Sequence, residues 1–192
     1  MAASLLPRGF KAKAERTAIA LRKELELLPV DSLCGFKLAE HLKISVYTPT
    51  EFFSSETNID DLVGTDKGWS ALTMKTGKDN TILVHNHLHA PTRQQSNLMH
   101  ELAHIICEHK HPVTYANITL PFFMRVFDKQ QEEEANYLGS TLQITRDALV
   151  WALKKRMEIP EIAEYFMASQ DMVKLRINTT GVKQQLSYLN NK

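Results

Sequence analysis

The chain has little of what marks a secreted, membrane-spanning or disulfide-bonded protein. It contains only two cysteines, Cys34 and Cys107, which lie far apart and form no CxxC pair, so neither a disulfide framework nor a thiolate zinc site is expected. No apolar run is long enough to cross a bilayer, and residues 1–8 lack the charged start and apolar stretch of a secretory signal peptide. We therefore expect a soluble, cytoplasmic protein.

Neither sign of charge predominates. Lys and Arg together number 23 against 22 for Asp and Glu, so the chain offers no electrostatic footprint for DNA, RNA or anionic lipid. We expect no direct nucleic-acid partner and no membrane association. What the chain does have is 192 residues with 43% hydrophobic content, which suffices for one domain with a sizeable core.

The first half of the sequence predicts two helices and three strands. Helical spacing of apolar residues predicts an amphipathic helix over 10–28, and Asp31 or Ser32 can cap a second one that ends at Leu42. Strands are expected over residues 44–47, 69–76 and 81–87, the last two joined by a turn as an antiparallel hairpin. Residues 51–67 indicate a loop or a short helix.

The second half predicts helices only. They are expected over residues 92–110, 128–142 and 146–157 and, in two short pieces, over 162–177. Thr92 and Gln95 form a capping-box pattern at the start of the first of these helices, and Thr145 can cap the third. The whole pattern predicts an α+β fold that is mainly helical, with a small, largely antiparallel sheet packed beside the helix of residues 92–110.

An HExxH motif, from His100 to His104, lies near the middle of that helix. Positions four apart share one helix face, so the two imidazoles can bind one cation. Glu101 lies beside them and can accept a proton from an attacking water, whose pKa a zinc ion lowers toward about 7. The alternative is a core helix that merely contains two histidines, but Leu98 and Leu102 can pack such a helix while both imidazoles face a cleft.

A third protein ligand is needed, because a hydrolytic zinc has three protein ligands and one open position. The acidic run that starts at Glu132 is the obvious source. On a helix, Glu132 shares a face with Ala135, which permits close packing, and with Asn136, which can hydrogen-bond an imidazole. Glu133 and Glu134 remain alternatives as ligands, although an acidic patch at a helix N-terminus also explains them.

The remaining histidines suggest weaker hypotheses. His85, His87 and His89 alternate and would share one face of a strand, where a second metal site is conceivable. His109 and His111 are expected to complement the negative end of the HExxH helix.

HELAH, followed by EEEAN 28 residues after His104, resembles the ImmA/IrrE family of zinc metallopeptidases. The likeness extends to residues 9–15, 38–42 and 82–86 and covers most of the chain. The resemblance implies a gluzincin-like site in which His100, His104 and Glu132 hold Zn²⁺ and Glu101 is the catalytic base. It also implies one zincin-like metallopeptidase domain over residues 1–192, with N-terminal helices over 1–43 and a C-terminal helical lobe over about 158–192.

The family suggests a site-specific protease that acts on a regulatory protein, such as a helix-turn-helix transcriptional repressor. We expect the substrate peptide to add as a strand along residues 81–87, and Tyr115, Tyr137 and Arg176 are candidate donors to the oxyanion. One alternative is a non-catalytic, zinc-containing anti-repressor module that acts by binding. Another is a DNA-binding regulator, since residues 161–177 can mimic a helix-turn-helix, but the neutral charge favours a packing or docking lobe there.

Overall fold

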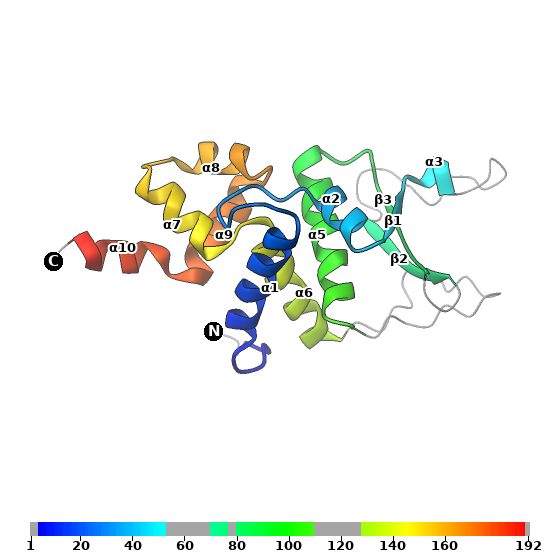
Figure 1. The fold of residues 1–192 in the computed structure, drawn as a ribbon, viewed down its shortest axis with the longest axis horizontal. Coiled ribbons are helices and arrows are strands. Elements are labelled where there is room, and N and C mark those ends of the chain that lie inside the picture. The colour runs from blue at the N-terminus through cyan, green and yellow to red at the C-terminus, as the bar shows by residue number, and fades with distance from the viewer. Residues whose placement is uncertain (1–3, 53–69, 77–79, 110–127, 191–192) are drawn as a thin grey trace.

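The computed structural model describes residues 4–52, 70–76, 80–109 and 128–190 of the chain. Within these residues the fold is α+β and mainly helical, as predicted, with a small sheet at one end of the molecule and the C-terminal helices at the other (Figure 1). In chain order the elements are α1 (Phe10–Glu24), α2 (Gly35–His41), β1 (Ser45–Tyr47), α3 (Pro49–Phe52), β2 (Ala71–Thr76), β3 (Asn80–His85), α5 (Pro91–Ile106), α6 (Lys129–Gln143), α7 (Arg146–Lys154), α8 (Ile159–Tyr165), α9 (Gln170–Thr180) and α10 (Val182–Asn190). No helix in this part of the chain is both long and apolar enough to span a membrane.

The sheet has the strand order β1-β3-β2. β2 pairs with β3 in antiparallel register, from Ala71 opposite His85 to Thr76 opposite Asn80, which confirms the predicted hairpin. β1 runs parallel to β3, so the sheet is mixed. Because β1 and β2 flank β3 on both sides, the prediction that a substrate peptide adds along residues 81–87 is wrong, and β2 is an outer strand of the described sheet.

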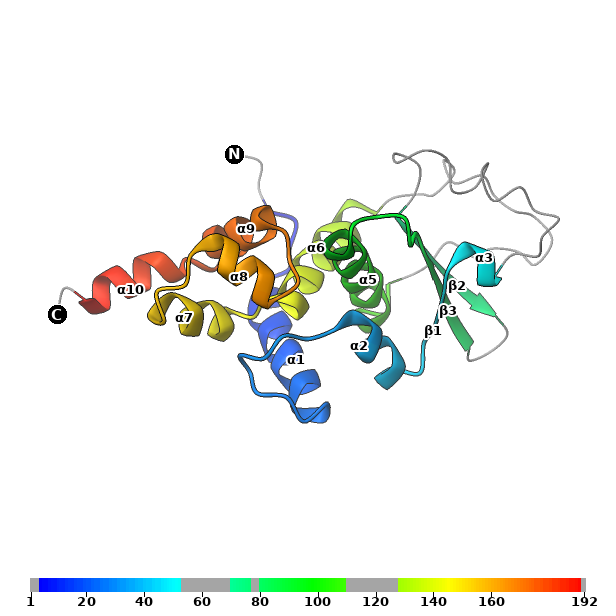
Figure 2. The same cartoon turned by 90° about the horizontal axis from the view of Figure 1, so that it is seen from above.

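α5 lies between the sheet and α6, an arrangement that both views show (Figures 1 and 2). Leu98, Leu102 and Leu83 are fully buried in one cluster that joins α5 to the sheet. On the side of α6, Gly139 lies so close to α5 that an added Cβ would come within 3.0 Å of the Met99 carbonyl oxygen and 3.1 Å of the His100 Cα. The two helices therefore touch backbone to backbone at His100.

Helix starts were predicted with mixed success. Thr145 caps α7 as predicted, because its side chain accepts a hydrogen bond from the Ala148 N–H. Asp31 and Ser32 do not cap α2, which begins later with Cys34 as its N-cap.

The capping box expected at the start of α5 is also absent. Ala90, and not Thr92, is the N-cap, and no side chain caps it. The Gln95 side chain instead accepts a hydrogen bond from the Gly35 N–H at 3.1 Å and donates one to the Leu33 carbonyl at 2.8 Å. Gln95 therefore fastens the start of α2 to α5, because both its oxygen and its nitrogen bond backbone groups that burial removes from water.

Among the helices that the structure describes, five end on a residue with left-handed backbone that is not glycine. These residues are Glu26, Lys43, Glu108, Arg156 and Met167, with φ between 50° and 58°. After each of them, the next N–H returns to the carbonyl five residues earlier, which is the Schellman pattern. That next residue is apolar at four of the ends, whereas at the end of α5 it is His109.

Arg22 is a buried cation that joins α1 to the end of α6. Its guanidinium donates to the carbonyls of Leu142 at 2.9 Å, Asp31 at 3.1 Å and Ala18 at 3.2 Å. Burial lowers the pKa of Arg22 from 12.5 to about 10, so it stays charged at neutral pH. The carbonyl at Leu142 belongs to the last turn of α6, which has no partner within its own helix.

The apolar core of the described residues falls into two clusters. The first runs from Phe10 to Leu142 in sequence and joins α1, α2, the sheet, α5 and α6, and the second begins at Ile144 and joins α7, α8, α9 and α10. α7 therefore packs with the C-terminal helices, which are predicted to begin only near residue 158. Ile162 and Val173 are fully buried in the second cluster, as the packing interpretation of residues 161–177 requires.

Candidate metal centre

Two imidazoles and a carboxylate converge where α5 and α6 meet. His100 and His104 lie one turn apart on α5, and their Nε2 atoms are 3.1 Å apart. Glu132, in the first turn of α6, places its carboxylate oxygens 3.4 Å from the His100 Nε2 and 3.5 Å from the His104 Nε2. These three side chains form one group whose ligand atoms could hold a metal ion.

The spacing of these atoms fits a zinc ion. Nitrogen and oxygen ligands bind zinc at about 2.0–2.1 Å, so two ligands on a tetrahedral zinc are about 3.3–3.4 Å apart. The observed separations of 3.1, 3.4 and 3.5 Å bracket that value. The donor set is also the one that hydrolytic zinc sites use, with three protein ligands and room for a fourth.

α6 brings Glu132 to this point because of how it begins and packs. The Asp128 side chain accepts hydrogen bonds from the N–H groups of Gln130 and Gln131, so it is the N-cap and fixes the start of the helix. Ala135 and Gly139 continue the face that carries Glu132, and both are buried against α5. Ala135 was predicted in this role, whereas Gly139 was not.

The three neighbouring glutamates separate into three different environments. Glu133 accepts hydrogen bonds from the Ser4 hydroxyl and the Leu5 N–H, in the segment that precedes α1. Those two bonds lower the pKa of the Glu133 carboxyl. Glu134 instead bonds the His109 Nε2 at 3.1 Å. Of the three, Glu132 alone lies against both HExxH histidines in the described structure.

Glu101 is held by the sheet. The Thr73 hydroxyl, on β2, donates a hydrogen bond of 2.5 Å to the Glu101 Oε2. No sequence pattern indicates this contact, because a threonine in a β-strand is ordinary and its partner is 28 residues away. The bond fixes the carboxylate of the residue that follows His100, and Glu101 is not part of the group that could bind a cation.

The other predicted site residues lie elsewhere. Asn136 is exposed and lines a hollow with Ser4 and Glu133. Tyr137 packs edge-to-face on Phe10. The Arg176 guanidinium lies over the Tyr137 ring.

Arg176 is fully buried and engaged in structural contacts. It donates to the Ile144 carbonyl at 2.9 Å and pairs with Glu15 at 2.6 Å. The structure therefore brings neither Tyr137 nor Arg176 together with the candidate metal ligands. The third candidate oxyanion donor, Tyr115, lies outside the described residues.

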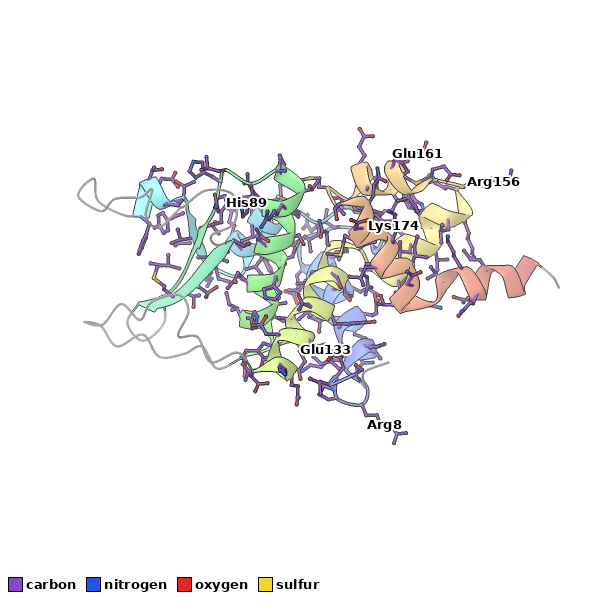
Figure 3. All side chains as sticks on the ribbon, turned by 180° about the vertical axis from the view of Figure 1, so that it is seen from behind. Arg8, His89, Glu133, Arg156, Glu161 and Lys174 are labelled. Atoms are coloured by element: carbon purple, nitrogen blue, oxygen red, sulfur yellow. The ribbon has the colours of Figure 1, made fainter. Side chains whose placement is uncertain are left out.

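The alternating histidines after the hairpin form no metal-binding group within the described residues. β3 ends at His85, and His87 lies in a turn, so the strand that would align the three histidines does not continue. Figure 3 shows His89 near the start of α5, in the upper part of the view, whereas Glu133 lies in the lower part. Burial, and secondarily the charge of His87, lower the pKa of His85, whose Nδ1 is buried without a hydrogen-bond partner.

His109 was predicted only to complement the negative end of the HExxH helix, but its contacts make it a functional candidate. It is buried, and its Nδ1 lies 2.9 Å from the Nδ1 of His104. With Cys107 and Glu134 it forms a second group that could hold a metal ion. Burial, with the nearby Glu134 charge, raises the pKa of the Cys107 thiol. His111, predicted to act with His109, lies outside the described residues.

The comparison with known families agrees with this geometry. Residues 54–178 match the Peptidase M78 family model, described as the IrrE N-terminal-like domain. No curated protein matches the chain. The match contains the HExxH histidines, Glu132 and the helices that carry them, and it covers well over half of the sequence. The chain therefore belongs to the IrrE N-terminal-like family of M78 peptidases.

Proposed function

We propose that the chain is a zinc-dependent metallopeptidase that hydrolyses a peptide bond in a regulatory protein. One observation carries the proposal. The Nε2 atoms of His100 and His104 and the carboxylate of Glu132 lie 3.1–3.5 Å apart, and Glu101, the residue after His100, is hydrogen-bonded to Thr73 in the sheet. Membership of a peptidase family supports the same conclusion.

The residues of the centre divide into ligands and a proton carrier. His100, His104 and Glu132 would hold the zinc, which when bound supplies a Lewis acid that polarises the scissile carbonyl and acidifies water. Glu101 takes the proton of the attacking water and passes it to the leaving amine. Thr73 orients the Glu101 carboxylate for both transfers, because its hydroxyl occupies one carboxylate oxygen.

β2 supports a binding mode for the substrate. It is an outer strand of the described sheet and carries Thr73, which contacts Glu101. A peptide that adds as a strand beside β2 would therefore run past the catalytic carboxylate, with main-chain hydrogen bonds providing affinity. We therefore propose β2, and not β3, as the strand beside which the peptide binds.

A helix-turn-helix transcriptional repressor is the substrate class that we propose. The support is the resemblance of HELAH and EEEAN to peptidases that act on such repressors. The near-neutral charge of the chain fits recognition of the repressor protein and not of its DNA.

Glu101→Gln tests the reaction and the metal site together. The amide keeps the shape and the hydrogen bond to Thr73 but cannot take a proton, so cleavage should fall by about 100-fold or more, as expected for loss of a general base, while bound zinc stays at one per chain. Zinc would be measured by elemental analysis. Cleavage would be measured as new N-termini in a lysate of the source cells, identified by mass spectrometry.

Glu132→Ala is the matched variant for the ligand role, and it should lose zinc as well as cleavage. A zinc-loaded wild-type protein that creates no more new termini than Glu101→Gln would overturn the peptidase proposal. It would favour a module that acts by binding alone.

A further inference from the structure

His109 and Glu134 extend the centre in a direction that the peptidase mechanism does not use. The ring of His109 is buried, and both of its nitrogens have partners, Nδ1 with the His104 Nδ1 at 2.9 Å and Nε2 with the Glu134 Oε2 at 3.1 Å. The other Glu134 oxygen accepts from the Gln130 side-chain amide at 2.8 Å. A continuous chain of hydrogen bonds thus leads from His104 to α6.

We propose that His109 and Glu134 are positioning residues that hold His104 as a metal ligand. The proposal rests on the proposed zinc site, and it assigns the group of Cys107, His109 and Glu134 to the support of one cation and not to the binding of a second.

The positions of the protons on the His104 and His109 rings support this assignment. The Nε2 of His104 faces His100 and Glu132 and must offer a lone pair to the cation, so the single proton of the neutral ring lies on Nδ1. That N–H donates to the His109 Nδ1, which must then accept. The proton of His109 consequently lies on Nε2 and donates to Glu134. Each of the two imidazole N–H groups therefore has an acceptor.

A second cation on His109 conflicts with the same counting. A metal at the His109 Nε2 would move the proton of that ring to Nδ1, where it would face the Nδ1–H of His104 at 2.9 Å. Two N–H groups cannot share that contact. The group of His100, His104 and Glu132 is therefore the one metal site. The group that contains His109 and Glu134 supports that site and binds no cation of its own.

The end of α5 explains how His109 reaches His104. Glu108 has left-handed backbone, with φ 55°. The His109 N–H returns to the His104 carbonyl at 3.0 Å, and the Glu108 N–H returns to the Ile105 carbonyl at 3.0 Å. In this Schellman turn the residue at the His109 position packs against the one at the His104 position, usually through an apolar contact. Here a hydrogen bond between two imidazoles replaces that contact.

The series of hydrogen bonds that starts at His104 ends on the Glu134 carboxylate. Hydrogen bonding of a ligating histidine to a carboxylate fixes the ring orientation and makes its metal-binding nitrogen more basic. Glu134 does this through His109. Glu132 lies two residues before Glu134 on the same helix. α6 therefore provides both the ligand Glu132 and the carboxylate that supports the ligand His104.

Two variants of His109 test the proposal. His109→Phe keeps a buried ring and removes both nitrogens, whereas in His109→Asn the side-chain oxygen replaces Nδ1 as the acceptor for His104. We expect His109→Phe to weaken zinc binding by about 10–100-fold, the usual effect of losing such a partner, and His109→Asn to recover most of that loss. Zinc affinity would be measured on metal-free protein by competition with a chromophoric chelator.

Glu134→Gln, with Glu133→Gln as its matched control, completes the set. Glu134→Gln removes the charge but keeps an acceptor, so we expect a smaller loss of affinity than in His109→Phe. Glu133→Gln makes the same change one residue earlier, on a side chain that bonds Ser4 and Leu5, and it should leave zinc affinity unchanged. Circular dichroism of each metal-free variant separates a weakened site from a misfolded chain.

The possible failures can be distinguished. Zinc affinities of His109→Phe and wild type within two-fold of each other would overturn the support role while leaving the zinc site intact. Uptake of two zinc ions per wild-type chain, with one lost in His109→Phe, would overturn it in favour of a second cation site. A wild-type protein that takes up no zinc would instead contradict the proposed function itself.

Discussion

Single residues of the centre differ in how readily the sequence reveals them. His100, Glu101 and His104 follow from helix periodicity alone, and Glu132 from the need for a third ligand. Thr73 and His109 do not, because each contact is made across a turn or between elements, and neither residue type is unusual at its position. The sequence therefore predicts the candidate ligands better than it predicts the residues that contact them.

His85 should make folding stability depend on pH. Burial lowers its pKa below the ordinary 6.5, so the unfolded chain binds a proton that the folded chain resists. His85 has no such destabilising effect above the pKa that it has in the unfolded chain, and the free energy of unfolding falls as the pH drops through about 6.5 and below. His85→Leu should therefore lose less stability than wild type between pH 7.5 and pH 5.5, as measured by urea unfolding. Equal losses in both proteins would contradict this assignment.

Among the secondary-structure elements, the contact between α5 and α6 sets the geometry of the centre. The long periodic helices and the hairpin were predictable, because their patterns are local. The closeness of the two helices was not, since it depends on which small residue faces which backbone. Gly139 lies against the backbone at Met99 and His100, a pairing that periodicity does not specify.

Gly139→Ala should push the two helices apart. Its Cβ would lie 3.0–3.1 Å from backbone atoms of Met99 and His100, which cannot rotate away as a side chain can. We expect a loss of about 1–3 kcal/mol of stability, typical of overpacking, together with weaker zinc binding, because Glu132 moves with α6. Asn136→Ala, on the same helix but exposed, is the control and should change neither thermal unfolding nor zinc affinity. A stable Gly139→Ala with normal affinity would show that the helices tolerate greater separation.

For the whole molecule, buried arginines join parts of the chain that are far apart in sequence. Arg22 ties α1 to the end of α6, and Arg176 ties α9 to α1 through Glu15. Glu15 also accepts from the Arg146 N–H at the start of α7, so one carboxylate serves both C-terminal elements. The fold class was predictable from composition and periodicity, whereas these long-range cations were not, because arginines on amphipathic helices usually face solvent.

Arg176→Met should reduce stability without changing the chemistry. Removing the guanidinium leaves Glu15 and the Ile144 carbonyl without their buried partner, which should cost about 2–4 kcal/mol given that Glu15 keeps some contact with solvent. Urea unfolding would measure the loss, and zinc affinity should stay at the wild-type value. Lys174→Met, which removes an exposed ion pair on the same helix, should cost less than about 1 kcal/mol. A stable Arg176→Met with a reduced kcat would instead restore Arg176 as an oxyanion donor.

Replacing the non-glycine residues at the left-handed helix ends should raise the thermal stability of the protein. Glu26, Lys43, Arg156 and Met167 all project into solvent, and each accepts a backbone conformation that costs an ordinary residue about 1 kcal/mol or more. Glycine would remove that penalty while giving the unfolded chain more freedom, so the net benefit per position is at most about 1 kcal/mol. A more thermotolerant version of the chain can therefore be sought at four places remote from the metal ligands.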